Sequence, residues 1–359
     1  YHHLDDRESD WSEVWRPYAF DKNDKGLAPT DHWQSLWKDY QDPNNKSLYN
    51  ATDTGPAYES AEVSDSTYID GLLTEKVIRD LKKLKKSAKP FFLTAGFITP
   101  HLPFNAPKKY WDLYDRTSIK QPENYNYIPR NAPKMSISNW DEMRSYSNIP
   151  KRGQVSDSIA INLIHGYYAT VSYTDALIGK VLQELKNQQL DQNTIVVLVS
   201  DHGYNLQEHT QWAKFTNYNT STQVPLIIHN PLAKGKGTTN ALTALVDLYP
   251  TLAELCNLEV PKNQLDGTSV VPILNNPNLE GKKHVFIKQT NGFTLKTNDF
   301  SYTEFIKPQD NSTLATMLYD HRTTKNENEN IAHLIAYKQT VSKLKLILHS
   351  SYQKNIEGF

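Results

Sequence analysis

The stretch TIVVLVSDHGYNLQEHTQWAKF, residues 194–215, decides the fold of this chain. A nearly continuous apolar run ends at Val199 and is followed directly by Asp201, His202 and Gly203. A short apolar run of this kind is typical of a strand in a sheet that helices cover on both faces. Ligands of such sheets gather beyond the carboxyl ends of the strands. A carboxylate beside an imidazole at this edge favours metal-assisted handling of a phosphate or sulfate group, while a capping Asp and a locally packed His are the alternative.

The composition limits the class of protein. A chain of 359 residues is long enough for a sizeable core. Lys and Arg number 39 against 40 Asp and Glu, which argues against nucleic-acid binding through bulk charge. No stretch approaches ~18 consecutive apolar residues, so no membrane span is expected. The single cysteine, Cys256, excludes an internal disulfide and a thiolate metal cluster, and its apolar helical surroundings predict that it is buried.

Helical and strand patterns alternate through the first three quarters of the chain. The periodicity predicts helices over residues 67–86, 158–188 and 244–258 and apolar strands over residues 91–97, 194–200 and 224–230. The apolar stripe of the second helix is expected at Ile161, Ile164, Tyr168, Val171, Ile178, Val181 and Leu185. We therefore predict an α/β fold with a central, mostly parallel sheet covered by helices on both faces.

The pattern changes near residue 280. Residues 284–290, 292–298 and 300–306 alternate as short strands, and residues 331–348 have a helical pattern. We predict a small C-terminal antiparallel α+β subdomain over residues 280–359, after a larger domain over residues 1–279.

Several segments, in the same order along the chain, resemble the sulfatases of the alkaline-phosphatase-like superfamily, in particular their iduronate-2-sulfatase-like branch. The opening stretch, continued to residue 231, resembles the region that carries the last two metal ligands and a catalytic lysine. The other segments are GPAYESAEVSDSTYIDG, KPFFLTAGFITPHLPFNAPKKYWDLYD, GYYATVSYTDALIGKVLQEL, VDLYPTLAEL, LDGTSVVPIL and MLYDHRTTKNENENIAHL. The resemblance covers nearly the whole chain and implies an alkaline-phosphatase-like fold, sulfate-ester hydrolysis and one divalent metal ion, normally Ca²⁺.

The resemblance implies a role for each matched residue. Asp201 and His202 match the metal-binding pair, and Lys214 matches the lysine that touches a sulfate oxygen. His101 matches the histidine that protonates the departing alcohol oxygen, a task that suits a side chain titrating near neutral pH. A surface lysine and a loop histidine are the alternatives. His209 is expected to be structural.

The N-terminal residues match the family only in part. His2 matches the histidine near the nucleophile, whereas Asp5 and Asp6 are expected to be loop residues, because no strand precedes them as one precedes the metal-binding Asp pair of the family. Thr99 stands where the family usually has Lys, which puts in doubt the recognition of an acidic sugar through that position.

The nucleophile motif Cys/Ser-x-Pro/Ala-x-Arg, whose first residue sulfatases convert to formylglycine, does not occur in the sequence. We expect the chain to be the sulfatase catalytic domain without its N-terminal portion, with formylglycine and central strands in the missing N-terminal segment. The isolated chain is then predicted to bind metal weakly, to lack turnover and to leave apolar faces exposed.

The resemblance implies a sulfated carbohydrate substrate of the 2-O-sulfated uronate type, and an exported (periplasmic or secreted) or lysosomal protein. Two alternatives stay open. One is a phosphoester or phosphonate hydrolase of the same superfamily, and the other is a non-catalytic carbohydrate-binding remnant of a sulfatase.

Overall fold

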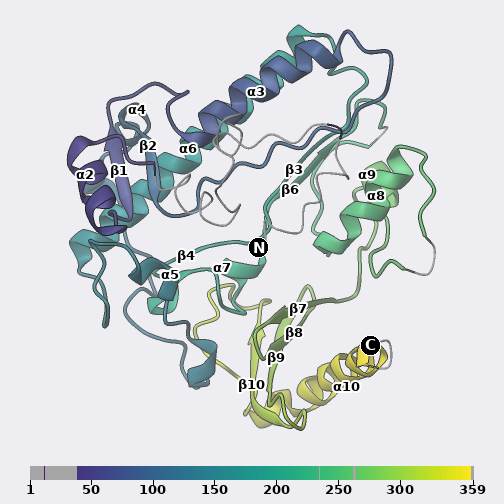
Figure 1. The fold of residues 1–359 in the computed structure, drawn as a ribbon. Coiled ribbons are helices and arrows are strands. Elements are labelled where there is room, and N and C mark those ends of the chain that lie inside the picture. Colours follow the sequence, from purple (N-terminus) through teal and green to yellow (C-terminus); the bar gives the residue numbers. More distant parts are fainter. Residues whose placement is uncertain (1–11, 13–38, 234, 262–263, 357–359) are drawn as a thin grey trace. The chain divides into compact units, whose positions relative to one another are not determined.

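The structure is a computed structural model that describes residues 12, 39–233, 235–261 and 264–356. The chain forms two compact units (Figure 1). The first unit consists of Tyr1–Gln121 and Asp141–Gln192, and the second consists of Pro122–Trp140 and Asn193–Phe359. The predicted domain boundary between residues 279 and 280 stays a prediction.

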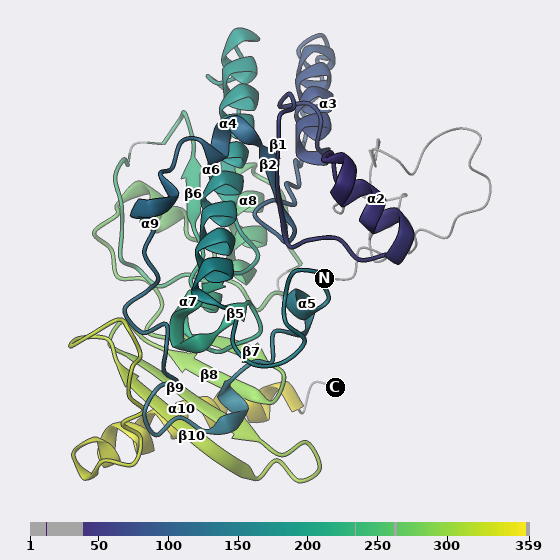
Figure 2. The same ribbon diagram turned by 90° about the vertical axis from the view of Figure 1, so that its left-hand side faces the viewer.

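The first unit is built on the helix α6, Asp157–Asn187, which is 31 residues long. The Ser156 side chain accepts a hydrogen bond from the Ile159 N–H and caps its first turn. Helix α3, Ile69–Leu84, packs beside α6 (Figure 2). Both predicted helices are therefore confirmed. No helix in the described part of the chain is both long and apolar enough to cross a membrane.

The buried face of α6 agrees with the predicted stripe only in part: Ile164 and Leu185 are buried as predicted. Tyr168 and Val171 are exposed, whereas Tyr173 and Leu177 are buried in a cluster with Trp111 and its neighbours. The stripe was predicted from apolarity alone, but the aromatic rings that bury most surface lie on another side of the helix. The other elements among the described residues of this unit are α2 Pro43–Thr52, β1 Tyr58–Ala61, β2 Phe104–Pro107, α4 Lys108–Trp111, the 3₁₀ turn η2 Arg116–Ser118 and α5 Asp141–Arg144.

The strand predicted over residues 91–97 is wrong. Within the described residues this segment pairs with no strand, and Phe92 is 71% exposed. The strand of this region is β2, which pairs in parallel with β1 in the register Tyr58↔Phe104. Apolarity is not sufficient for a strand, because the backbone groups also need a neighbouring strand.

The apolar run of the opening stretch forms β3, Val196–Val199, as predicted. Its partner is β6, Leu226–His229, which confirms the other predicted strand. The two strands run antiparallel, with Val197 opposite Ile228. Among the named strands of the described residues the parallel pairing is that of β1 with β2, so the predicted central parallel sheet is only partly seen.

The predicted C-terminal antiparallel sheet is confirmed and has four strands in the order β10-β9-β8-β7. Its strands are β7 Val285–Gln289, β8 Gly292–Lys296, β9 Phe300–Ile306 and β10 Thr313–Asp320, of which the last was not predicted. Helix α10, Lys338–Ile356, begins later than the predicted residue 331. Its Leu344 and Leu348 pack on Leu295, Tyr302 and Leu318 of the sheet.

Short elements complete the second unit. They are η3 Lys134–Ser136, β4 Asn205–Leu206, η4 Glu208–Thr210, β5 Trp212–Ala213, α7 Asn219–Thr222, η5 Leu245–Asp247, α8 Leu248–Leu255, α9 Val271–Asn275 and η6 Ile335–Tyr337. The prediction that Cys256 is buried is wrong. Cys256 is exposed just after the C-terminal end of α8, because the helix ends at Leu255, three residues before the predicted end at residue 258.

Candidate functional site

Strand β3 delivers the predicted acid and imidazole to its carboxyl end. Asp201 follows two residues after Val199, and its side chain is 55% exposed. Its Oδ1 accepts a hydrogen bond of 3.0 Å from the His202 N–H. The Ser200 hydroxyl donates to the His202 carbonyl oxygen at 2.8 Å. These short local bonds hold both side chains at the end of the strand.

The imidazole of His202 is oriented by its own loop. Its Nδ1 lies 2.8 Å from the Gly203 carbonyl oxygen, an acceptor, so we assign the Nδ1–H as the donor. Nε2 then presents its lone pair, 3.7 Å from Asp201 Oδ2. Two ligand atoms about 3.5 Å apart suit neighbouring positions around one cation with metal–ligand bonds of about 2.4 Å.

The donor set fits one side of a divalent cation site. Carboxylate oxygen suits Ca²⁺, and the free imidazole nitrogen is a common metal ligand. Among the described residues no group of three or more His, Cys, Asp or Glu side chains could hold a metal ion. A complete cation site would therefore need further ligands in addition to Asp201 and His202.

Gly203 allows the chain to turn directly after this pair. A Cβ atom at this position would lie 2.0 Å from the Thr220 carbonyl oxygen, closer than any side chain can approach. The Gly203 N–H donates to the Ser221 carbonyl oxygen at 2.9 Å. The loop after the Asp-His pair is thus packed against helix α7.

Lys214 is brought back toward this loop by a two-stranded sheet. Strands β4 and β5 pair antiparallel, with Asn205 opposite Ala213. Asn205 lies three residues after His202, and Lys214 directly follows Ala213. Ala213 adopts a left-handed backbone conformation, with φ of 63°. Lys214 is half-buried, and its Nζ lies 5.6 Å from the centre of the Phe215 ring. Its contact with a sulfate oxygen stays a prediction.

His209, expected to be structural, is buried in the same unit. Its Nε2 lies 2.8 Å from the Asn326 carbonyl oxygen and 3.2 Å from the Asn124 amide nitrogen. Burial lowers the pKa of His209. These contacts describe a packed histidine.

His101 belongs to the first unit and is held by two acceptors. Its Nδ1 lies 2.6 Å from the Leu102 carbonyl oxygen, and its Nε2 lies 2.8 Å from Glu142 Oε1. A carbonyl and a carboxylate on opposite sides of the ring fix its orientation. The role of His101 toward the departing alcohol stays a prediction.

The structure gives Thr99 a contact inside the protein. Its hydroxyl donates to Asp70 Oδ2 at 2.5 Å and lies 2.6 Å from the Thr174 hydroxyl. Asp70 is buried, also accepts the backbone N–H groups of Ile98 and Thr99, and has its pKa raised by burial. Thr99 therefore anchors the loop before His101. His2, Asp5 and Asp6 lie outside the described residues, so their assignments stay predictions.

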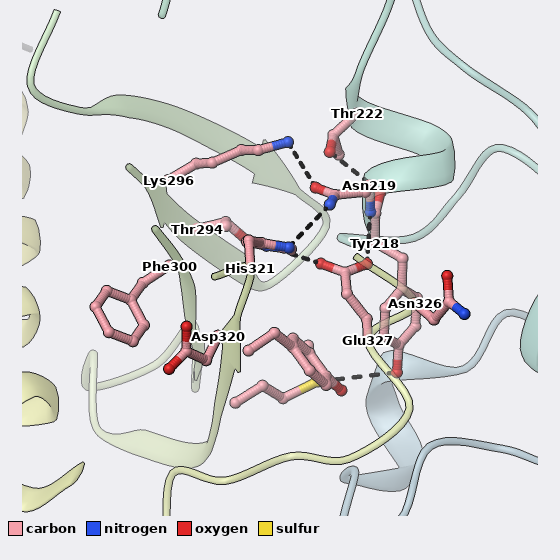
Figure 3. Close-up of polar contacts among 12 residues, drawn as sticks. Tyr218, Asn219, Thr222, Thr294, Lys296, Phe300, Asp320, His321, Asn326 and Glu327 are labelled. Carbon is pink, nitrogen blue, oxygen red and sulfur yellow. Dashed lines mark hydrogen bonds and ion pairs between the residues drawn. The ribbon is translucent and has the colours of Figure 1, made fainter. Parts of the chain in front are cut away.

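A buried polar cluster that the sequence did not predict lies beside α7 (Figure 3). Glu327 and His321 come from the chain after β10, Lys296 comes from the end of β8, and all three face Asn219. The signal that could have found it is the segment MLYDHRTTKNENENIAHL, which is polar but contributes Glu327 to the interior.

Comparisons with known proteins agree with the sequence resemblance. Residues 17–258 match the family described as Sulfatase, and residues 207–354 match the one described as N-sulphoglucosamine sulphohydrolase, C-terminal. Iduronate 2-sulfatase of Mus musculus is 33% identical over 233 residues, which are 56% of this chain and 42% of that protein. A sulfatase of Formosa agariphila is 28% identical over 336 residues, or 90% of this chain and 62% of that protein. The chain therefore spans between about two fifths and three fifths of the length of these two relatives.

Solved structures share the fold. The phosphonate monoester hydrolase SpPMH from Silicibacter pomeroyi aligns with a TM-score of 0.69 at 21% identity, covering 92% of this chain and 67% of that chain. BT4656 in complex with its substrate D-glucosamine-2-N,6-O-disulfate aligns with a TM-score of 0.66 at 21% identity, covering 81% of this chain and 70% of that chain. At this identity the likeness shows the alkaline-phosphatase-like fold alone.

Proposed function

The chain belongs to the sulfatase family, and from this premise we propose that it carries one side of the metal site and the sulfate-binding lysine of a sulfatase. The observation that supports this most directly is the His202 imidazole, whose Nδ1 is occupied by Gly203 while Nε2 faces Asp201. The substrate that we propose is a sulfate ester of a sugar or polysaccharide, of the 2-O-sulfated uronate type.

Each residue has one proposed task. Asp201 Oδ2 and His202 Nε2 would hold the divalent cation, which would neutralise charge on the sulfate oxygens. The Lys214 ammonium would contact one of these oxygens. His101 would give a proton to the alcohol oxygen as its bond to sulfur breaks. In sulfatases the nucleophile is formylglycine, and because its motif does not occur in this sequence we propose that this chain alone does not turn over.

Cation binding tests the proposal in the 359-residue chain. Calcium titration by calorimetry is expected to show one site, which Asp201→Asn weakens by at least roughly 10-fold because a charged ligand is lost. The matched control is Asp266→Asn, which changes a carboxylate that is also exposed and leaves the affinity unchanged. Equal affinities in all three proteins would exclude Asp201 as a ligand.

Turnover is tested separately with a 2-O-sulfated uronate glycoside. The chain is expected to release no sulfate at any calcium concentration. Release of sulfate by the chain, abolished by Asp201→Asn, would show that the nucleophile lies within this sequence.

A further inference from the structure

Helix α7 lies against the loop that follows the candidate metal pair. The Gly203 N–H donates to the Ser221 carbonyl oxygen at 2.9 Å. The Thr220 hydroxyl donates to Asn205 Oδ1 at 2.5 Å, and Asn205 Nδ2 donates to the Ser221 hydroxyl at 2.8 Å. Asn205 Nδ2 also donates to the Ala213 carbonyl oxygen at 2.6 Å, immediately before Lys214. One helical turn therefore contacts the loop after the Asp201–His202 pair, and Asn205 of that loop links it to the residue before Lys214.

The first residue of α7 is held from the other direction by the C-terminal sheet and the loop after it. The Asn219 N–H donates to Glu327 Oε2 at 2.8 Å (Figure 3). Lys296 Nζ donates to Asn219 Oδ1 at 2.5 Å, and Asn219 Nδ2 lies 3.4 Å from His321 Nδ1. Since Asn219 uses its backbone and both side-chain atoms, its position is set by these three partners.

The polar side chains of this cluster are buried, and burial shifts their pKa values. The Glu327 side chain is 4% exposed, and burial raises the pKa of its carboxyl group to about 7. Burial also lowers the pKa of His321 to about 4 and, outweighing the attraction of Glu327, lowers the pKa of Lys296. Removing the hydrogen-bond partner of a buried polar group costs more free energy than removing the partner of an exposed one, because water cannot replace the buried partner.

We propose that Glu327 is a positioning residue of the cation site. Through the Asn219 N–H it fixes α7, and through Ser221 and Thr220 the helix fixes the backbone of residues 203–205. This proposal rests on the proposed function, because residues 203–205 belong to the loop that orients Asp201 and His202. It gives the C-terminal sheet a task in cation binding although none of its residues is a ligand.

The test is hydrogen exchange of the folded chain, followed by mass spectrometry of its peptides. Glu327→Ala removes the acceptor of the Asn219 N–H and is expected to speed exchange in residues 201–206 and 214–222 by at least about 10-fold. Glu327→Gln keeps a carbonyl acceptor at the same place and is expected to stay within about 3-fold of the parent chain. Peptides from α3, in the other unit, are the internal reference.

Asn330→Ala is the matched control. Asn330 is also buried, lies three residues further along the same loop, and makes three hydrogen bonds of 2.9 Å with Leu318, Asn131 and Thr316. Those bonds do not involve α7, so exchange in residues 201–206 should be unchanged. Equal exchange in this loop for Glu327→Ala and the parent chain, or equal acceleration by Asn330→Ala, would overturn the proposal.

Calcium titration of the same variants separates this inference from the proposed function. Glu327→Ala is expected to weaken calcium binding at least about 5-fold, while Glu327→Gln restores most of it. Absence of calcium binding by the parent chain would refute the proposed function, and the exchange experiment would still decide the coupling. Unchanged affinity in Glu327→Ala, with binding still sensitive to Asp201→Asn, would refute the positioning role alone.

Discussion

Two sheets of the second unit are built from similar apolar strands but differ in how far their side chains are exposed to solvent. In the two-stranded sheet β3–β6, Val199 is 41% and Ile227 is 60% exposed. In the four-stranded sheet β7–β10, Leu295, Tyr302 and Leu318 are fully buried. The same kind of sequence thus gives an open sheet in one place and a core in the other.

The difference comes from what covers each sheet. Helix α10 lies on the four-stranded sheet and contributes Leu344 and Leu348 to one cluster with it. Burial of such side chains contributes about 1.5–3 kcal/mol each. The two-stranded sheet keeps apolar side chains in contact with solvent, and the strand β3 leads directly to Asp201. Stability is therefore expected to reside mainly in the covered sheet, and candidate chemistry at the end of the open one.

The largest expected effect is on a matched pair of isoleucines, one in each sheet. Ile306→Ala, in the covered sheet, should lower the free energy of unfolding by about 2–4 kcal/mol, because it leaves a cavity. Ile227→Ala, in the open sheet, should lower it by less than about 1 kcal/mol, because the side chain is already exposed. Urea unfolding of both variants measures the two values. Equal losses would mean that β3–β6 is covered in solution.

A smaller effect is expected from pH, through the buried pair beside the covered sheet. Burial raises the pKa of Glu327 to about 7 from 4.5, so the folded state holds its proton longer and stability falls as pH rises between these values. Burial, with Lys296, lowers the pKa of His321 to about 4 from 6.5, so stability rises with pH between these values. The two dependences oppose each other between pH 4.5 and 6.5.

Glu327→Gln removes the pH dependence that comes from Glu327 and should leave the one that comes from His321. The stability of this variant, relative to the parent chain, should rise with pH by on the order of 1 kcal/mol between pH 4.5 and 6.5. Urea midpoints at several pH values measure it. Glu329→Gln, which changes a neighbouring carboxylate that is paired with Arg130 at the surface, should leave the profile as it was. A fall with pH in the Glu327 variant would contradict the neutral state of His321.

The smallest effect is expected at Cys256, the residue that follows helix α8. Cys256→Ser should change the free energy of unfolding by less than about 0.5 kcal/mol, because the thiol is exposed. In the folded parent chain the thiol should react with a soluble disulfide reagent as fast as in urea. If the Cys256 thiol reacted only after unfolding, it would be buried in the folded chain, as predicted from the sequence.

The elements that could be predicted are those with a local signal. The helices α3 and α6, the strands β3 and β6 and three strands of the C-terminal sheet follow from periodicity, because each pattern lies within a few adjacent residues. The segment 91–97 has the same apolarity as β3 but forms no strand in the described structure. What differs is the presence of a partner strand, which no local pattern contains.

The candidate site divides in the same way. The Asp201–His202 pair could be placed at the end of a strand from adjacent residues alone, and the motif resemblance supplied Lys214 and His101. The contact of Glu327 with Asn219 joins positions 108 residues apart, and the imidazole tautomer depends on where the Gly203 carbonyl lies. Neither could be predicted, since both depend on distances that the folded backbone sets.

The sequence by itself determined the long helices α3 and α6, which runs are apolar, and that an acid and an imidazole close the run ending at Val199. The tertiary structure alone decided which of two similar sheets is buried, which face of α6 packs, and that the Glu327 carboxylate accepts a hydrogen bond from the first residue of α7. The physical reason is range: backbone propensity and periodicity act between near neighbours, whereas burial and hydrogen-bond partners are supplied by residues that only folding brings together.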